Sequence, residues 1–535
     1  MMMTKKLRLV LIIAACAVVV GVAGVVLVSS GNRPAGKKAS GLSTYTVADS
    51  TGDWGYPTPY GMYPRGPGYI RMSFIFDTLL WKDRDGLSGA LAKDWSYDVQ
   101  ENSYTFTLRP GLKWHDGQDL TAQDVAFTFA CVREHPWPWM KSGVVEEAVA
   151  IDARTVRISL SQPYAPFLTN IAGTLPILPR HVWREVDDPA TFRGERAVIG
   201  SGPYRLADYD PAHGSYLYTA RDDYYLGKPR VDRIRFVKYS EEMTPTALRT
   251  GKVDAGSVPP ETIDGLKEAG MRVMSQPPVW AAKLMINHDK PRLSERKLRR
   301  ALAHTIDRDR LVRIVRRGHG IPGSSGLIPP TSELWHNPDV TQYSHDVKKA
   351  AQLLRELGYT RDDDGMFARD GERLEFELLV SPERQEFGRL AEMLKRQFEQ
   401  AGIAITTRSA EAKTLDSMLQ NGQFELALSG HGGLGGDPEI LSRMITGGSF
   451  NSARYRSNED LVALLRKQLR QMDRERRRQT VFRIQRIYAE EVPAVTLYHP
   501  TWYWAHDGTA DLYYTPGGVA LGIPIPLNKW SFVEP

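Results

Sequence analysis

The sequence predicts an α/β fold, for three reasons. Segments such as 104–108 alternate apolar and polar residues, which is the period of a half-buried strand. Segments such as 346–358 repeat apolar residues at helical spacing and end at a glycine. The helix predicted over 387–398 passes through Gly402 into the strand-like segment 403–405, and a helix that feeds a strand directly is typical of α/β construction.

The first half of the chain predicts mainly strands. Residues 104–108 read Tyr-Thr-Phe-Thr-Leu, and Pro110-Gly111 ends that strand. Thr121, with Asp124 three positions later, matches the start of a helix. A second alternating segment, 156–160, predicts another strand.

The second half predicts well-marked helices. Ser294, Asp307 and Asp346 each precede an apolar pattern of helical spacing, as N-cap residues do. Gly318 and Gly358 follow the last apolar residue of two of these patterns and predict the ends of the helices.

Composition sets outer limits on function. The 535 residues allow about three or four folding units. The net charge of +6 is small for this length and is not gathered into one stripe, which argues against a nucleic-acid binder. The densest basic stretch, 466–486, predicts the solvated face of an amphipathic helix, with contact to anionic lipid or a membrane partner as the alternative.

Cysteine usage is sparse. Cys16 lies in the N-terminal apolar segment, so Cys131 is the only thiol of the globular part. The sequence therefore predicts no internal disulfide and no cysteine-based metal site.

The N-terminal segment predicts the compartment. Basic residues at positions 5, 6 and 8 precede an apolar run over 9–28. About 20 apolar residues suffice to cross a bilayer, so we expect residues 1–28 to be a signal peptide or a membrane anchor. The basic flank should stay in the cytoplasm, which places the rest of the chain outside.

Three fates of this segment stay open. Residues 13–16, Ile-Ala-Ala-Cys, resemble the lipobox of bacterial lipoproteins, although the apolar run continues beyond Cys16. Retention as an anchor, lipidation and simple cleavage all leave the body extracytoplasmic. Residues 29–41, rich in Ser, Gly and Lys, predict a flexible linker to the membrane.

Signatures of catalysis are absent from the sequence. It contains no HExxH, P-loop, CxxC or GxSxG string, and the glycine-rich segment 430–436 lacks the GxGxxG spacing of a dinucleotide loop. The sequence therefore predicts no catalytic residues, no cofactor and no protein-only metal site.

Several strings follow one another in a recognisable order. Residues 104–117 read YTFTLRPGLKWHDG, and residues 120–128 read LTAQDVAFT. This pair resembles the signature of the peptide and nickel class of ABC-transporter solute-binding proteins, bacterial extracellular family 5. Further matching strings are LAKDW at 91–95, GSGPY at 200–204, ALRTGKVD at 247–254 and KLRRALAHTIDR at 297–308.

The resemblance implies a two-lobed, periplasmic-binding-protein-like clamp of type II. It implies a first lobe over 42–275 plus 496–535, a subdomain inserted at about 82–194, and a second lobe over 276–495. The implied function is the substrate-binding component of an ABC importer. As a monomer, it would capture a small polar, oligopeptide-like solute between its lobes and deliver it to the permease subunits, without a nucleic-acid partner.

The resemblance also points to a ligand-binding loop. Residues 430–438, GHGGLGGDP, match the second-lobe loop that supplies a carboxylate to the peptide amino terminus in peptide-binding members. Asp437 is retained, His431 replaces a tryptophan, and Leu434 occupies the acid position. Because a buried ammonium without a carboxylate is costly, Leu434 disfavours the standard peptide mode. His431 is instead a candidate for contacting a metal chelate or a carboxylate.

Aromatic and basic residues elsewhere are further candidates. Aromatic rings could stack on a ligand, and the planar guanidinium of arginine could bind a carboxylate through two hydrogen bonds. The alternative for each is packing in a loop or core. These candidates are Trp54, Tyr60, Tyr63, Arg65, Arg71 and Trp280.

Two other functions compete with peptide capture. A binder of nickel or of a metallophore chelate would use His431 and cleft arginines. A membrane-tethered extracytoplasmic sensor or chaperone would use the N-terminal segment as its anchor.

Overall fold

The computed structural model describes residues 43–141, 143–381 and 385–533. The signal or anchor segment predicted at 1–28 and the linker predicted at 29–41 lie outside these residues. Within them, no helix combines the length and the apolarity needed to span a membrane.

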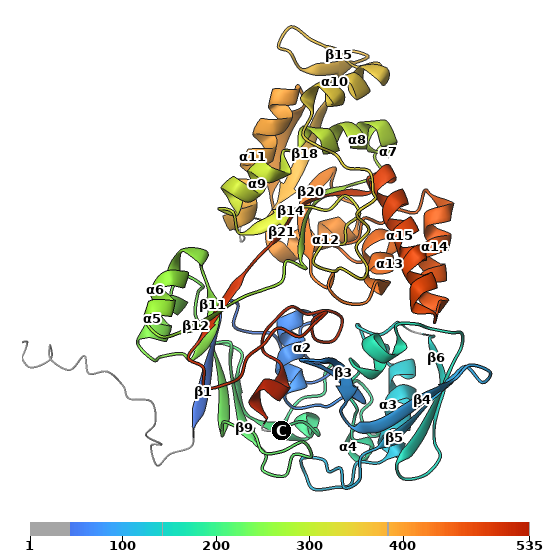
Figure 1. Ribbon diagram of the computed structural model, residues 1–535, viewed down its shortest axis with the longest axis vertical. Coiled ribbons are helices and arrows are strands. Elements are labelled where there is room, and N and C mark those ends of the chain that lie inside the picture. Colours follow the sequence, from blue (N-terminus) through green and yellow to red (C-terminus); the bar gives the residue numbers. More distant parts are fainter. Residues whose placement is uncertain (1–42, 142, 382–384, 534–535) are drawn as a thin grey trace, which may run out of the picture. The chain divides into compact units, whose positions relative to one another are not determined.

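The largest sheet forms the centre of the first lobe (Figure 1). Strand β1 runs parallel to β10 and β11, and the other pairs are antiparallel. In the described residues its seven strands are, in spatial order, β12 (Arg272–Ser275), β22 (Tyr503–His506), β11 (Ala255–Val258), β1 (Thr44–Asp49), β10 (Arg233–Lys238), β9 (Ser215–Ala220) and β8 (Tyr204–Asp210).

A second sheet forms the centre of the second lobe. Strand β18 pairs in parallel with β19 and β20, whereas β13 is antiparallel to both of its neighbours. Its six strands in the described residues are β14 (Gly320–Pro322), β21 (Ala494–Pro500), β13 (Ala281–Ile286), β20 (Leu426–His431), β18 (Glu375–Val380) and β19 (Ala404–Ser409).

Smaller sheets lie beside these two. One of them is a four-stranded antiparallel sheet on which α3 packs. Their strands are β2 (Leu80–Asp83) with β3 (Gly86–Gly89); β4 (Ala92–Asp98), β5 (Ser103–Leu108), β7 (Thr155–Leu160) and β6 (Val145–Ala150); and β15 (Thr360–Arg361), β16 (Phe367–Arg369) and β17 (Glu372–Arg373).

Helices connect the strands in both lobes. The first-lobe helices are α2 (Gly66–Ser73), α3 (Ala122–Glu134), η1 (Phe167–Ala172), α4 (Arg180–Trp183), η2 (Glu195–Val198), α5 (Thr244–Arg249), η3 (Pro260–Thr262), α6 (Ile263–Glu268) and η4 (Lys529–Phe532). The second-lobe helices are α7 (Pro291–Ser294), α8 (Arg296–Thr305), α9 (Arg308–Val315), α10 (Val347–Glu356), α11 (Gln385–Ala401), α12 (Ala412–Gln420), α13 (Glu439–Thr446), α14 (Glu459–Arg470) and α15 (Arg474–Glu491).

Local sequence signals explain where these elements begin. Thr121 and Asp124 form the capping box of α3, with the Thr121 backbone N–H donating to the Asp124 carboxylate (2.8 Å). The carboxylates of Asp307 and Asp346 cap α9 and α10. Ser294 does not cap α8, because it is the last residue of α7.

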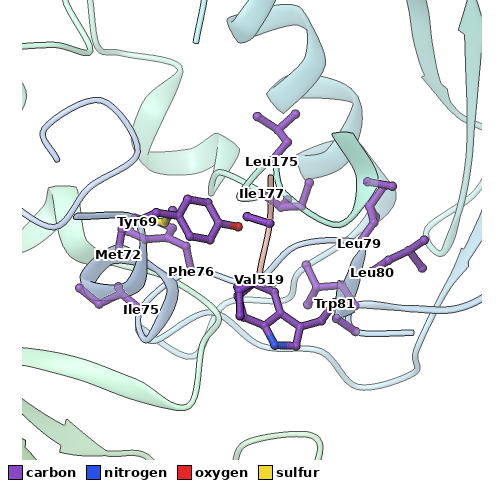
Figure 2. Close-up of a cluster of buried hydrophobic side chains, with 14 of the residues drawn as sticks. Tyr69, Met72, Ile75, Phe76, Leu79, Leu80, Trp81, Leu175, Ile177 and Val519 are labelled. Atoms are coloured by element: carbon purple, nitrogen blue, oxygen red, sulfur yellow. The ribbon is translucent and has the colours of Figure 1, made fainter. Parts of the chain in front are cut away.

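The core of the first lobe includes residues from the far end of the chain. Tyr69, Trp81 and Ile177 are buried together with Val519 of the C-terminal segment (Figure 2). This packing anchors the segment 515–523, hereafter the C-terminal loop, to the first lobe. Two further cores lie on the two faces of the second-lobe sheet.

The chain passes between the two sheets at 276–280, which joins β12 to β13, and at 501–502, which joins β21 to β22 (Figure 1). The resemblance predicts the second passage at residue 496, whereas strand pairing places it after Pro500, because β21 completes the second-lobe sheet. The inserted-subdomain boundaries at 82 and 194 stay predictions.

Candidate functional site

Two glycine-rich loops meet where the lobes face each other. The glycine loop (residues 430–436) follows β20, and the C-terminal loop comes from the first lobe. A Cβ on Gly522 would lie 2.8 Å from Gly433 Cα, and a Cβ on Gly517 would lie 3.0 Å from the Gly435 carbonyl oxygen. Gly433 and Gly522 also have φ near +90°. The close backbone approach therefore requires glycine on both sides.

Leu434 faces the interior rather than the cleft. Its side chain is buried in the second-lobe core with Ile440 and Leu441. Its carbonyl accepts a hydrogen bond from the Ser332 hydroxyl (2.8 Å). The glycine loop thus has a packed leucine at the position where the resemblance predicts an acid in peptide-binding members.

His431 is buried at the end of β20. Its Nδ1 pairs with the carbonyl of Gly432 (2.9 Å), and its Nε2 has no hydrogen-bond partner among the described residues. Burial, and then the charge of Lys283, hold the pKa of His431 well below its usual range. The prediction that His431 contacts a ligand stays untested; its side chain is buried and does not face solvent.

Asp437 forms an ion pair with Arg477 inside the second lobe. Its two carboxylate oxygens accept hydrogen bonds from Nη1 and Nη2 of Arg477 (2.7 and 2.5 Å). The same carboxylate lines a cavity of about 270 Å³ opposite Lys82 of β2. Burial lowers the pKa of Lys82 to about 8, and the charge of Asp437 works against that shift.

A larger cavity of about 570 Å³ lies between residues 138–141 and helices α13 and α14. We call it the basic cavity. Its lining carries the cations Lys141, Arg443, Arg456 and Arg466. Trp139 and Met140 supply an apolar wall. Such a surface suits an organic anion, because the cations attract the charge and the aromatic ring covers apolar atoms.

Glu439 is the acidic member of this lining in the described part of the chain. It is buried, and its Oε2 accepts a hydrogen bond from Nδ2 of Asn170 in η1 (2.7 Å). Nearby, the N–H of Ala165 donates to the carbonyl of Leu469 (2.8 Å). These contacts join the lobes beside the cavity, whose lining carries one carboxylate against four cations.

Three predicted ligand residues lie at another contact between the lobes. Arg65 forms an ion pair with Asp416 of α12 (2.7 Å), and its guanidinium lies over Phe450. Tyr63 and Trp54 lie next to each other beside Arg65. Trp54 also donates from Nε1 to Asp49, so it is partly used in holding its own loop.

Trp280 lies against the glycine loop. Its ring fills the space that a side chain at Gly430 would need, and it contacts Trp502 edge to face (5.5 Å between centroids). Trp280 and His431 are therefore close, since Ala281 is the strand partner of His431.

Tyr60 and Arg71 make contacts within the first lobe. Tyr60 donates its hydroxyl to the carbonyl of His135 (2.7 Å) and packs on Trp183. Arg71 is 2% exposed, forms an ion pair with Asp49 and lies over a core phenylalanine ring. Arg71 thus neutralises a carboxylate of its own lobe, and its pairing with a ligand carboxylate stays a prediction.

Three basic residues were not predicted from the sequence: Lys82 and Arg443, which line cavities, and Lys283, which is buried in β13. Lys283 alone carried a readable signal, because it is the single charge in the apolar strand AAKLMI. No group of three His, Cys, Asp or Glu side chains in the described ranges is arranged to hold a metal ion.

Comparison with known proteins identifies the family. The model described as "Bacterial extracellular solute-binding proteins, family 5 Middle" matches residues 86–453. The dipeptide-binding protein of Escherichia coli (strain K12) is 26% identical over 452 residues, which cover 77% of this chain and 80% of that protein.

Solved structures show the same fold. NikA from Brucella suis, in complex with Fe(III)-EDTA, has a TM-score of 0.78 at 20% identity and covers 92% of this chain and 99% of its own. NikZ from Campylobacter jejuni, in complex with Ni(L-His), has a TM-score of 0.77 at 20% identity with the same coverage. The two lobes joined by two crossings, the ordered motifs and the family match lead to one conclusion: the chain belongs to the bacterial extracellular solute-binding proteins of family 5.

Proposed function

We propose that this solute-binding protein captures a small organic anion between its lobes and delivers it to an ABC permease. The observation that carries the proposal is the basic cavity, whose lining has four cations and one carboxylate, with that carboxylate bonded to Asn170. A negatively charged ligand would offset the repulsion among the cations, which a neutral or cationic ligand would not.

The glycine loop supports the same assignment. Peptide capture through a free amino terminus needs an acid near Leu434, and Leu434 is packed in the core. The candidate ligand is therefore a solute held through carboxylates, which includes short peptides bound by their carboxyl ends.

An anionic metal chelate is the second candidate. One structural neighbour was solved with Fe(III)-EDTA, a chelate that carries a net negative charge. A chelate brings the ligands of its metal with it, so it needs a charged wall and not a protein-built metal site.

The remaining features of the proposal concern location and assembly. We infer that residues 1–28 direct the chain across the membrane or anchor it there, and that residues 29–41 tether the body on the extracytoplasmic side. The protein would act as a monomer that binds and releases its ligand unchanged.

Isothermal titration of the full-length protein tests the ligand class. The probes are trialanine, its N-acetyl form, its C-terminal amide, citrate, Ni(II)–histidine and Fe(III)-EDTA. We expect anionic probes to bind, N-acetylation to be tolerated and amidation to abolish peptide binding. Loss of binding on N-acetylation, with amidation tolerated, would overturn the proposal.

Two variants on neighbouring positions sharpen this test. Arg466 lines the basic cavity and Arg470, one helical turn further along α14, does not. Because a charge-assisted contact contributes about 1.5–3 kcal/mol, Arg466→Gln should weaken binding of the anionic probe by roughly 10- to 150-fold if Arg466 contacts it. Arg470→Gln is the control and should leave affinity unchanged.

A further inference from the structure

The basic cavity has apolar walls as well as cations. From the first lobe, Trp139 and Met140 line it. From α14 of the second lobe, Val462, Leu465 and Leu469 line it, and their spacing of three and four residues places them on one face of the helix. The cavity is therefore suited to a ligand that combines an apolar body with a negative charge.

Trp139 is held in place by neighbouring rings. The ring of Tyr69 lies parallel to it, with 4.9 Å between the centroids and 8° between the planes. Tyr69 is fully buried, its hydroxyl donates to the carbonyl of Thr174 (2.8 Å), and its ring is also parallel to that of Trp81 in the first-lobe core (Figure 2). Because Tyr69 covers one face of Trp139, the indole offers the cavity its opposite face or its edge.

A fixed indole distinguishes flat aromatic rings from other apolar groups. Aromatic pairs prefer offset-stacked or edge-to-face contacts, and both are compatible with an indole that Tyr69 already covers on one face. A saturated group at the same place gains only the burial of its area. Since Tyr69 already immobilises Trp139, contact with the ring of a ligand costs little further conformational entropy. Trp139 should therefore favour an aromatic ligand.

The acid group of such a ligand has partners on the second lobe. Arg443 of α13 and Arg466 of α14 line the same cavity as Trp139. The Nε–H of Arg443 is buried and has no hydrogen-bond partner among the described residues. Arg456, in contrast, already donates from Nε and Nη2 to the carbonyl of Thr446 (3.1 and 2.8 Å). A carboxylate beside Arg443 would supply the missing acceptor.

We propose that the anion captured by this protein is an aromatic organic acid, whose ring packs on Trp139 and whose carboxylate binds Arg443. The inference rests on the proposed anionic ligand and names its chemical class. The cavity volume of about 570 Å³ lies within the range of about 300–1,000 Å³ that is usual for small-molecule sites. Since Trp139 and Arg443 belong to different lobes, a ligand needs both its ring and its acid group to bridge them.

Two probes that differ only in the saturation of the ring test this class. N-benzoylglycine carries a flat ring, whereas N-cyclohexanecarbonylglycine carries a saturated ring with the same number of carbon atoms and the same carboxylate. Isothermal titration of the full-length protein should show that N-benzoylglycine binds about 2- to 12-fold more tightly, which is the contribution of an aromatic pair beyond its buried area. Hydrophobic burial alone predicts the opposite order, because the saturated ring exposes more apolar surface.

The outcomes separate this inference from the proposed function. If the saturated probe binds as tightly as N-benzoylglycine, or if neither binds while citrate or N-acetyl-trialanine does, the aromatic class is wrong and the proposed function stands. If none of these anions binds, both fail. N-benzoylglycinamide, which lacks the carboxylate, should bind far more weakly than the acid, and equal binding would contradict both.

Variants of Trp139 assign the preference to its ring. Trp139→Leu keeps the wall apolar but removes the ring, so the two probes should bind it with equal affinity, whereas Trp139→Phe should retain the preference. Trp95→Leu, on β4 and not among the described residues that line the cavity, is the matched control. A general loss of stability affects both probes alike, and the wild-type titration decides the class if Trp139→Leu fails to fold. An undiminished preference in Trp139→Leu would overturn the assignment.

Discussion

At the scale of single residues, charge pairing decides which polar groups are available. Asp437 keeps the sequence position of a ligand-binding aspartate, but Arg477 binds both of its oxygens and also donates to Gln468. This buried pair fixes the end of the glycine loop to α15. Asp437 therefore holds the loop in place, and both oxygens of its carboxylate already accept hydrogen bonds from Arg477.

Arg477→Met tests this structural role. The change leaves the carboxylate of Asp437 buried without its cation, which should lower the free energy of unfolding by about 3–5 kcal/mol. Arg476→Met, at the exposed neighbouring position, should change it by less than about 0.5 kcal/mol. Urea unfolding of both variants measures the difference, and equal stability of the two would contradict the role.

At the scale of elements, the glycine loop and the C-terminal loop have backbone surfaces of complementary shape. Each one is stiffened by its own lobe: Leu434 anchors the glycine loop and Val519 anchors the C-terminal loop. Because Gly433, Gly517 and Gly522 carry no side chain, the backbones approach closely at these positions. The fit depends on shape, so one added methyl group should disturb it.

Gly522→Ala should weaken anion binding by holding the loops apart. Gly522 has φ near +92° and a Cβ there would press on Gly433. Gly270→Ala is the matched control, since Gly270 has φ near +83° with open space around its Cβ position. Both substitutions should lower stability by about 1–2 kcal/mol from backbone strain.

Affinity separates the two glycine variants. Calorimetry with the anionic probe should show weaker binding for Gly522→Ala and unchanged binding for Gly270→Ala. If the two variants bind alike, the loop contact does not contribute to ligand capture.

At the scale of the whole folded body, contacts between the lobes compete with hinge opening. Asn170–Glu439 is a buried bond to a carboxylate, whereas Arg65–Asp416 is partly exposed. The buried bond should contribute about 1.5–3 kcal/mol and the exposed pair up to about 1 kcal/mol. Of these two contacts, the one next to the basic cavity should contribute more to closure.

Asn170→Ala should shift the ligand-free protein towards an open state, and Arg65→Gln should do so more weakly. The radius of gyration from small-angle X-ray scattering measures the shift, because opening moves the lobes apart. Arg84→Gln, which removes an exposed ion pair with Asp511 inside the first lobe, is the control. An unchanged radius in Asn170→Ala would show that this bond does not hold the lobes.

The sequence predicted the parts of the fold that depend on near neighbours. Residues 104–108 form β5 with Tyr104 and Phe106 buried, and the capping signals at Thr121 and Asp346 begin helices. These features could be predicted because hydrophobic periodicity and helix capping depend on residues only a few positions apart. The order of family motifs added the two-lobed arrangement.

The candidate site was harder to predict from the sequence, because the residues that contact one another there come from distant parts of the chain. Nothing near Arg71 in the sequence shows that Asp49 neutralises it. Likewise, the contact of the C-terminal loop with the glycine loop joins segments about 80 residues apart in sequence. Arg443 reads as an ordinary helix-surface arginine until α13 is placed over the sheet.

The two crossings between the lobes each carry a tryptophan, and these rings touch: Trp280 lies at the end of the first crossing and Trp502 on the second. A hinge rotation alters the angle and separation of two indoles that are close enough for their electronic transitions to couple. The near-ultraviolet circular dichroism of this tryptophan pair should therefore change when the hinge opens, so opening can be measured without an attached dye.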